Sequence, residues 1–147
     1  KINNQKSISL WGDGTPTRDF LYVEDAARGI VLAGEKYDGV EPVNLGSEDE
    51  ISIKELADLL SDIMGFNGKI IWDKSKPNGQ PRRCVSNQKA KEEFGFEPKI
   101  KLKEGLEKTV KWYKSFYEKQ KVLTNFDLQD YIEDAYLKGL SWTSNYR

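Results

Sequence analysis

Apolar and polar positions alternate at the start of the chain, over Ile8-Ser9-Leu10-Trp11, which predicts a strand. The glycines of Gly12-Asp13-Gly14 then predict a tight turn, and residues 18–23 are predicted to be extended. A helix is expected over residues 24–36, because two carboxylates stand in its first turn. The buried stripe expected for this helix consists of small or aliphatic residues: Ala26, Ala27, Ile30, Val31 and Ala33.

Further along the chain, short apolar runs alternate with helical spacing. Residues 42–46 (PVNLG) are predicted to form a short buried strand, and residues 69–72 another. Between them, Ser52 and Glu55 form a capping box that opens an amphipathic helix ending near Gly65. The pattern therefore continues to alternate between the two kinds of element.

The remaining chain follows the same alternation. Residues 73–81 (DKSKPNGQP) are predicted to be an exposed loop, because Pro, Asn and Gly favour turns. A short helix capped by Ser86 ends near Gly95, and a longer amphipathic helix covers residues 102–121. Residues 122–147 show no pattern that we can assign. Strands that alternate with helices predict an α/β protein, although the order is incomplete for a doubly wound sheet.

Composition and charge narrow the class of protein. The chain has 147 residues, of which 37% are hydrophobic and 32% charged, and its formal net charge is −1. We therefore expect no general attraction to nucleic acid or to an anionic membrane. Histidine is absent and Cys84 is the only cysteine, so neither a metal site nor an internal disulfide is expected. No apolar run is long enough for a membrane helix, and we expect a cytoplasmic protein.

The segment Gly12-Asp13-Gly14 raises the question of a phosphate-binding loop. Such a loop runs directly into a helix, whose N-terminal N–H groups then face the anion. Here Pro16 and an extended segment follow instead. The sequence therefore favours a turn between two strands over a phosphate cradle, with Arg18 at a defined position beside the turn.

Two cationic features are candidates for anion binding. The planar guanidinium of Arg18 suits diphosphate oxygens, and the alternative is a surface ion pair with Asp19 or Glu24. Residues 74–83 (KSKPNGQPRR) bring four cations together, and two prolines stiffen the segment. This favours an anion-binding loop, with a solvated basic loop as the alternative. No aromatic residue interrupts the run, which argues against single-stranded nucleic acid.

Five segments occur here in order: SLWGDGTPTRDFLYVEDAARGIVLA, VNLGS, ISIKELADLLSDIMGF, IIWDKSKPNGQPRRCVSNQKAKEEFGF and LKEGLEKTVKWY. Together, over roughly residues 5–120, they resemble the carboxy-terminal part of GDP-L-fucose synthase-like proteins. These belong to the NAD(P)-dependent nucleotide-sugar epimerases, dehydratases and reductases of the extended short-chain dehydrogenase type. The resemblance implies a mixed and partial α/β fold that forms the substrate-binding lobe of such an enzyme. Its helix after Glu24 and its strand at Val43 would belong to the Rossmann sheet.

The resemblance implies roles for four residues in binding a nucleotide diphosphate sugar, with a GDP-hexose as one candidate. Arg18 matches an arginine that grips the diphosphate, and Arg82 resembles a second arginine on the same side. Trp11 matches an aromatic residue that lines the cleft, with core packing as the alternative. Lys76 matches the lysine of an S-K-P-D-G loop that approaches the substrate, although the aspartate of that loop is Asn78 here.

The family's glycine-rich cofactor loop and its catalytic Tyr-x-x-x-Lys lie upstream of the matched region. We therefore expect no catalytic, cofactor-binding or metal-binding residue in this chain. Tyr117 and Lys121 have the Tyr-x-x-x-Lys spacing, but Tyr117 lies near the apolar stripe at the end of the last predicted helix, so we interpret the match as fortuitous. Cys84 follows two arginines, whose charge lowers a thiol pKa. Because no histidine is available as a base, a buried structural cysteine is favoured.

We expect residues 1–121 to be the carboxy-terminal substrate-binding region of a nucleotide-sugar epimerase or reductase, and residues 122–147 an extension of unassigned role. NAD(P) would serve the intact enzyme, with no cofactor expected for this chain alone. The chain enters a strand almost at Lys1, so we expect part of a longer protein. Its expected partner is an N-terminal Rossmann domain, and a homodimer is a further candidate. The alternative is a stand-alone, non-catalytic module that binds an anionic metabolite or a partner subunit.

Overall fold

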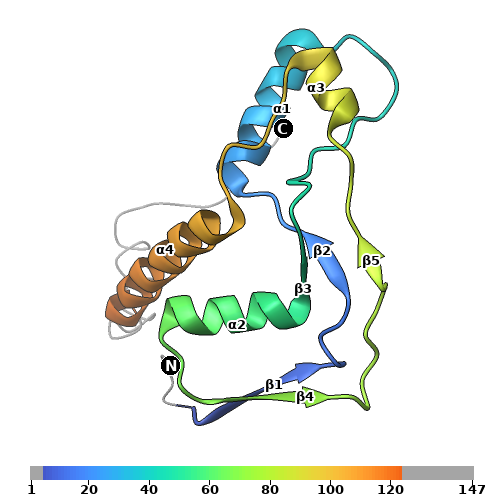
Figure 1. The fold of residues 1–147 in the computed structure, drawn as a ribbon. Helices are drawn as coiled ribbons and strands as arrows, with labels where there is room; N and C mark the ends of the chain where they lie inside the picture. Colours follow the sequence, from blue (N-terminus) through green and yellow to red (C-terminus); the bar gives the residue numbers. More distant parts are fainter. Residues whose placement is uncertain (1–4, 124–147) are drawn as a thin grey trace, which may run out of the picture. The chain divides into compact units, whose positions relative to one another are not determined.

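The computed structural model describes residues 5–123. Contacts divide the chain between Lys108 and Thr109, and the two parts are described separately. The elements, in chain order, are β1 (Ser7–Trp11), β2 (Thr17–Asp19), α1 (Val23–Lys36), β3 (Glu50–Ser52), α2 (Ile53–Met64), β4 (Lys69–Asp73), β5 (Arg82–Arg83), α3 (Gln88–Phe94) and α4 (Leu102–Leu123) (Figure 1). This order confirms the predicted α/β class.

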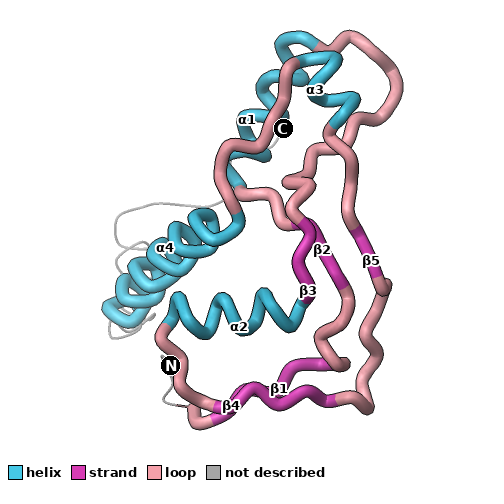
Figure 2. Tube along the Cα trace, viewed as in Figure 1, coloured by secondary structure: helices cyan, strands magenta, loops and turns pink. Residues whose placement is uncertain are grey.

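Two small sheets organise the first part of the chain. Strands β1 and β4 pair in parallel, with Trp11 opposite Asp73. In the second sheet β2 lies in the middle, antiparallel to β3 and parallel to β5, with Thr17 opposite Arg82 (Figure 2). Each sheet therefore joins a strand flanking the glycine turn to a strand flanking the 74–81 loop.

The core lies where α1 meets α3. Ala90, Phe94 and Phe96 are buried. Partly buried apolar residues pack against them: Leu21, Leu32, Ala33, Tyr37, Val43 and Leu45. Gly29 of α1 makes this approach possible, because a Cβ there would lie 2.8 Å from Leu45 Cδ1 and 2.9 Å from Phe96 Cε2.

The buried face of α1 differs from the predicted one. Ile30 is 66% exposed and Val31 58% exposed, and Ala27 is exposed as well. Asp25 and Gly29 are buried instead. The prediction of a buried stripe through Ala27, Ile30 and Val31 was therefore wrong for this chain. Hydrogen bonds to the Asp25 carboxylate, from residues far along the chain, orient the helix, and the spacing of apolar residues does not reveal them.

Residues 42–46 do not form the predicted strand. The Gly46 N–H donates to Asn87 Oδ1 at 2.7 Å, and the Gly46 carbonyl accepts from Asn87 Nδ2 at 2.6 Å. A side chain thus takes the backbone groups that a neighbouring strand would have taken. Val43 and Leu45 are still half-buried against the core, so the pattern indicated burial correctly but not strand pairing.

The predicted end signals of α2 are confirmed. Ser52 Oγ accepts the Glu55 N–H at 3.1 Å, the Ser52 N–H donates to Glu55 Oε2 at 3.0 Å, and Gly65 follows the helix with φ +61°. For α3, Asn87 rather than Ser86 is the N-cap residue. Among residues 5–123, no helix is long and apolar enough to cross a membrane.

Candidate functional site

The connection between β1 and β2 is a turn with two left-handed glycines, Gly12 (φ +80°) and Gly14 (φ +79°). The Gly12 N–H donates to the Asp73 carbonyl at 2.9 Å. A Cβ on Gly14 would lie 2.7 Å from the Trp72 ring, so a side chain there would displace Trp72. Because strand β2 follows the turn, and not a helix, it is not a phosphate cradle. The prediction of a turn between two strands is therefore confirmed.

Residues 74–83, the basic loop, fold back onto this turn. Asn78 Oδ1 accepts the backbone N–H of Asp13 at 2.8 Å. Further along the loop, the Pro81 carbonyl accepts the Thr17 N–H at 2.9 Å. These contacts hold the basic loop beside the segment that carries Trp11 and Arg18.

Trp11 and Lys76, predicted separately from the sequence, lie together. Lys76 Nζ is 5.9 Å from the centroid of the Trp11 ring, a cation–π contact of about 0.5–1 kcal/mol at an exposed site. Trp11 is 69% exposed, so it does not pack in a core formed by the described residues. An exposed indole ring beside an ammonium group suits a ligand that carries both a flat or apolar surface and a negative charge.

The Arg18 guanidinium is oriented by backbone carbonyls. One terminal nitrogen donates to the Thr17 carbonyl at 2.6 Å and the other to the Gln80 carbonyl at 2.7 Å. A guanidinium has five N–H donors, so further donors remain available for a ligand. The alternative ion pair with Asp19 or Glu24 is not seen among the salt bridges of the described residues.

Arg82 is engaged by a carboxylate. Its Nε lies 2.9 and 3.0 Å from the two oxygens of Glu50, and a terminal nitrogen lies 2.7 Å from Oε2. Glu50 also accepts a hydrogen bond from the Thr17 hydroxyl. The bonds from Arg82 and Thr17 hold the pKa of the Glu50 carboxyl below its ordinary value. The structure therefore places Arg82 beside the turn region but gives its guanidinium a protein partner.

Two residues considered for chemistry are not poised for it. Cys84 is half-buried, and burial together with the Asp19 and Glu50 carboxylates raises the pKa of its thiol despite the nearby Arg82. This opposes thiolate formation. Tyr117 lies in the last turns of α4, which continues to Leu123, close to the predicted end at residue 121. Its ring centroid is 6.2 Å from that of Tyr113.

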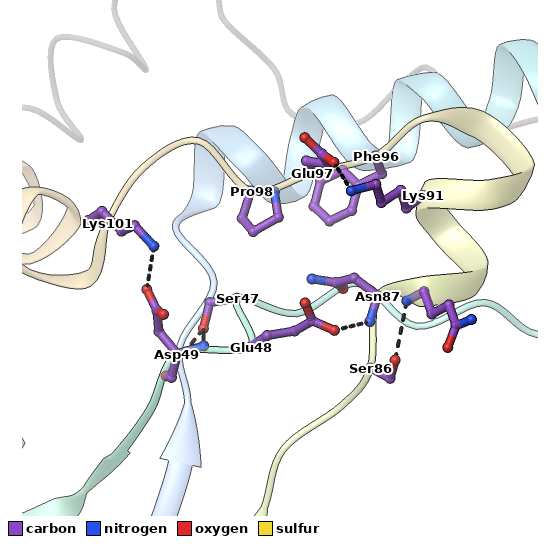
Figure 3. A pocket seen from close by; sticks show the side chains of 11 residues that line it. Ser47, Glu48, Asp49, Ser86, Asn87, Lys91, Phe96, Glu97, Pro98 and Lys101 are labelled. Atoms are coloured by element: carbon purple, nitrogen blue, oxygen red, sulfur yellow. Dashed lines mark hydrogen bonds and ion pairs between the residues drawn. The ribbon is translucent and has the colours of Figure 1, made fainter.

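A polar pocket of about 560 Å³ is lined by none of the candidate residues named above (Figure 3). It is lined by Ser47, Glu48, Asp49, Ser86, Asn87, Gln88, Lys91, Phe96, Glu97, Pro98 and Lys101. Lys91 forms an ion pair with Glu97 and Lys101 one with Asp49, so the lysines that line the pocket already have partners within the protein. This pocket was not predictable from the sequence, because its lining comes from separate segments without a shared motif. Among the described residues, no group of side chains suits a metal ion.

Comparisons with known proteins bear on this site. Residues 1–46 match the model of the NAD dependent epimerase/dehydratase family. The GDP-L-fucose synthase of Sinorhizobium fredii is 44% identical over 116 residues, which are 79% of this chain and 36% of that protein. GDP-L-fucose synthase 1 of Arabidopsis thaliana is 42% identical over 113 residues, 77% of this chain and 35% of that protein. The chain spans about a third of the length of the curated relatives it matches.

Solved structures give the same result. A GDP-L-fucose synthetase from Naegleria fowleri, bound to NADP, superposes with a TM-score of 0.69 at 33% identity, over 76% of this chain and 36% of that one. A UDP-glucose 4-epimerase from Thermotoga maritima, with UDP-glucose, has the same TM-score, identity and coverage. The resemblance drawn from the motifs is confirmed. By sequence and by fold, the chain is similar to members of the NAD dependent epimerase/dehydratase family, whose model matches its residues 1–46.

Proposed function

We propose that this chain binds nucleotide diphosphate sugars, as the substrate-binding part of a cytoplasmic NAD(P)-dependent epimerase or reductase of the GDP-L-fucose synthase type. The observation that carries the proposal is the fold of the basic loop onto the glycine turn. This loop carries Lys76, which lies over Trp11, and Gln80, whose carbonyl accepts from Arg18, so it contacts both of the other candidates. The names of the relatives, which are GDP-L-fucose synthases and a UDP-glucose epimerase, support this substrate class.

Arg18 is the principal diphosphate ligand in this proposal. Because two carbonyls already fix its guanidinium, little side-chain freedom is lost when a ligand binds. The planar guanidinium can give two parallel hydrogen bonds to diphosphate oxygens. Lys76 adds a point charge, and the exposed Trp11 ring offers a flat surface to the sugar or the base.

Arg82 contributes less than Arg18 to diphosphate binding in this proposal. The paired hydrogen bonds from Arg82 to the Glu50 carboxylate would have to break or rearrange before the guanidinium reached a ligand. The pair is exposed, and such ion pairs are worth about 0–1 kcal/mol, so a diphosphate could compete for Arg82 at small cost. We rank Arg82 below Arg18 for this reason.

The described residues do not fit a dinucleotide cofactor. The only glycine pair with the approximate spacing leads into β2, so no helix N-terminus faces a pyrophosphate there. In the proposed enzyme, NAD(P) supplies hydride transfer from another part of the protein. No reaction step is assigned to residues of this chain.

The exposed apolar face of α1 supports the presence of further protein. Val23, Ala27, Ile30 and Val31 share this face, and burying a side chain such as Ile30 contributes about 1.5–3 kcal/mol. We propose that the cofactor-binding part of the enzyme covers it. In the full-length enzyme, Ile30→Glu should then weaken NADP(H) binding, while the exposed control Lys36→Glu should not. Equal NADP(H) affinity in both variants would contradict this contact.

Calorimetric titration of this chain tests the proposed function. GDP- and UDP-sugars should bind more tightly than inorganic diphosphate, because only they contact Trp11. Arg18→Ala should cost about 1.5–3 kcal/mol of binding, the scale of a hydrogen bond to a charged group. Arg18→Lys should recover part of the lost affinity, because lysine keeps the positive charge but cannot form two parallel hydrogen bonds. Lys36→Ala, which removes a cation elsewhere, serves as the control.

Two results would count against the proposal. Unchanged nucleotide-sugar affinity in a folded Arg18→Ala variant would remove the diphosphate role of Arg18. Equal affinity for inorganic diphosphate and for nucleotide sugars would favour the alternative, a stand-alone anion-binding module.

A further inference from the structure

Asn78 meets the glycine turn at its most crowded point. Its Oδ1 accepts the Asp13 N–H at 2.8 Å. A Cβ on Gly12 would collide with the same oxygen, so the close approach of Asn78 requires a glycine there. The basic loop and the turn are thus fitted to each other at these three residues.

The side chain of Asp13 is the second group that Asn78 faces. Asp13 Oδ1 accepts the Thr15 N–H at 3.0 Å and the Thr15 hydroxyl at 2.7 Å. The bonds from Thr15, together with the side-chain amide of Asn78, hold the pKa of the Asp13 carboxyl below its ordinary value. Asp13 is therefore an anion at neutral pH, and residue 78 lies beside it.

An amide and a carboxylate differ at this position. An amide offers both an acceptor and two donors, whereas an ionised carboxylate only accepts. Asn78 can accept the Asp13 N–H and also donate towards the Asp13 carboxylate. An aspartate at position 78 could do only the first, and it would add a like charge beside Asp13.

We propose that Asn78 is a positioning residue for the nucleotide-sugar site. By accepting the Asp13 N–H, with its amide close to the Asp13 carboxylate, it holds the basic loop so that Lys76 lies over Trp11. The charge of Asp13 favours an amide over a carboxylate at position 78, where the S-K-P-D-G pattern has an aspartate. The link to substrate rests on the proposed function, whereas the closure of the loop does not.

A charge swap tests this assignment. Asn78→Asp should speed hydrogen exchange of the Asp13 amide and weaken nucleotide-sugar affinity about two- to fivefold, the scale of an exposed like-charge contact. The double variant Asp13→Asn/Asn78→Asp should restore both, because it again pairs a donor with an acceptor while Oδ1 at position 13 still serves Thr15. Asn67→Asp, at an exposed residue between α2 and β4, adds the same charge as a control.

The outcomes separate the two levels of the proposal. If the exchange rate of the Asp13 amide in Asn78→Asp equals that in Asn67→Asp, or if the swap restores nothing, Asn78 does not close the loop. If Asn78→Asp fails to fold, Asn78→Ala removes the same bonds without adding charge, and unchanged exchange there overturns the assignment equally. If the native chain binds no nucleotide sugar, the proposed function fails, while amide exchange still decides the role of Asn78 in loop closure.

Discussion

Asp25 and Ile100 stand 75 residues apart in the sequence, yet the Ile100 N–H donates to Asp25 Oδ2 at 2.7 Å. The Lys99 N–H donates to the same oxygen at 2.8 Å, and Arg28 donates to Oδ1 at 2.7 Å. The Asp25 residue is only 2% exposed. A buried anion with three hydrogen bonds therefore fixes the start of α1 to the segment that precedes α4.

Replacing this carboxylate should destabilise the chain. Asp25→Asn places an amide against N–H donors and leaves part of the set unsatisfied, so we expect a loss of about 1–3 kcal/mol of unfolding free energy. Urea denaturation at neutral pH measures it. Asp58→Asn, at an exposed position of α2, is the matched control and should change little.

The pH dependence of this contribution has a defined sign. Burial raises the pKa of Asp25, but the bonds from Arg28, Ile100 and Lys99 lower it more, so the pKa lies below its ordinary value of 3.8. A depressed carboxyl pKa stabilises the fold above the unfolded pKa, and the gain disappears as pH falls through the folded one. The stability difference between the native chain and Asp25→Asn should therefore shrink below about pH 4. An equal difference at neutral and acid pH would contradict this account.

Asn87 should tolerate no change of its hydrogen-bonding pattern. It is 4% exposed, and its amide serves both the N–H and the carbonyl of Gly46. Asn87→Asp would place a carboxylate oxygen against that carbonyl, so we expect a loss of about 1–3 kcal/mol or more. Thermal unfolding compared with Asn67→Asp measures the effect. Equal melting temperatures would show that the amide is dispensable.

Removing the partner of Arg82 should show whether this arginine reaches the substrate. Glu50→Gln weakens the paired hydrogen bonds from Arg82 and frees the Arg82 guanidinium. If Arg82 then contacts the diphosphate, nucleotide-sugar affinity should rise about two- to fivefold, the scale of the exposed ion pair it loses. The gain should vanish in Glu50→Gln/Arg82→Ala. A gain that persists in the double variant would arise elsewhere and would remove Arg82 from the site.

Tyr117 should be dispensable for turnover. In the full-length enzyme, Tyr117→Phe should leave kcat within a few-fold, because the ring stacks on Tyr113 within α4 and keeps that contact as phenylalanine. A true general acid or base contributes about 10²–10⁴-fold. A loss of that size in Tyr117→Phe, with Tyr113→Phe unaffected, would identify Tyr117 as catalytic.

Local interactions were predictable from the sequence. The capping box of α2 joins residues three apart, and the glycine turn needs only its own two left-handed residues, so short motifs identify both. The four binding candidates were recognised through a family resemblance. The structure places Lys76 over Trp11 and the Gln80 carbonyl against Arg18, and the binding roles themselves stay predictions.

Distant interactions were not predictable. The buried face of α1 depends on Asp25 and the backbone at Lys99 and Ile100, and apolar spacing alone pointed to another face. Arg82 was expected beside a ligand, but it meets Glu50, which lies 32 residues away. Each of these contacts joins polar groups from separate elements, for which a single sequence carries no periodic signal.

Two parallel connections of unequal length link the sheets. Trp11 lies opposite Asp73 and Thr17 opposite Arg82, so the ends of both connections coincide. One connection has five residues, 12–16, and the other eight, 74–81. The longer one must therefore arch away from the shorter, and Lys76 lies within that arch. Shortening or lengthening it would change the space above the indole ring without altering either sheet, so under the proposed function loop length alone would set the size of sugar that fits.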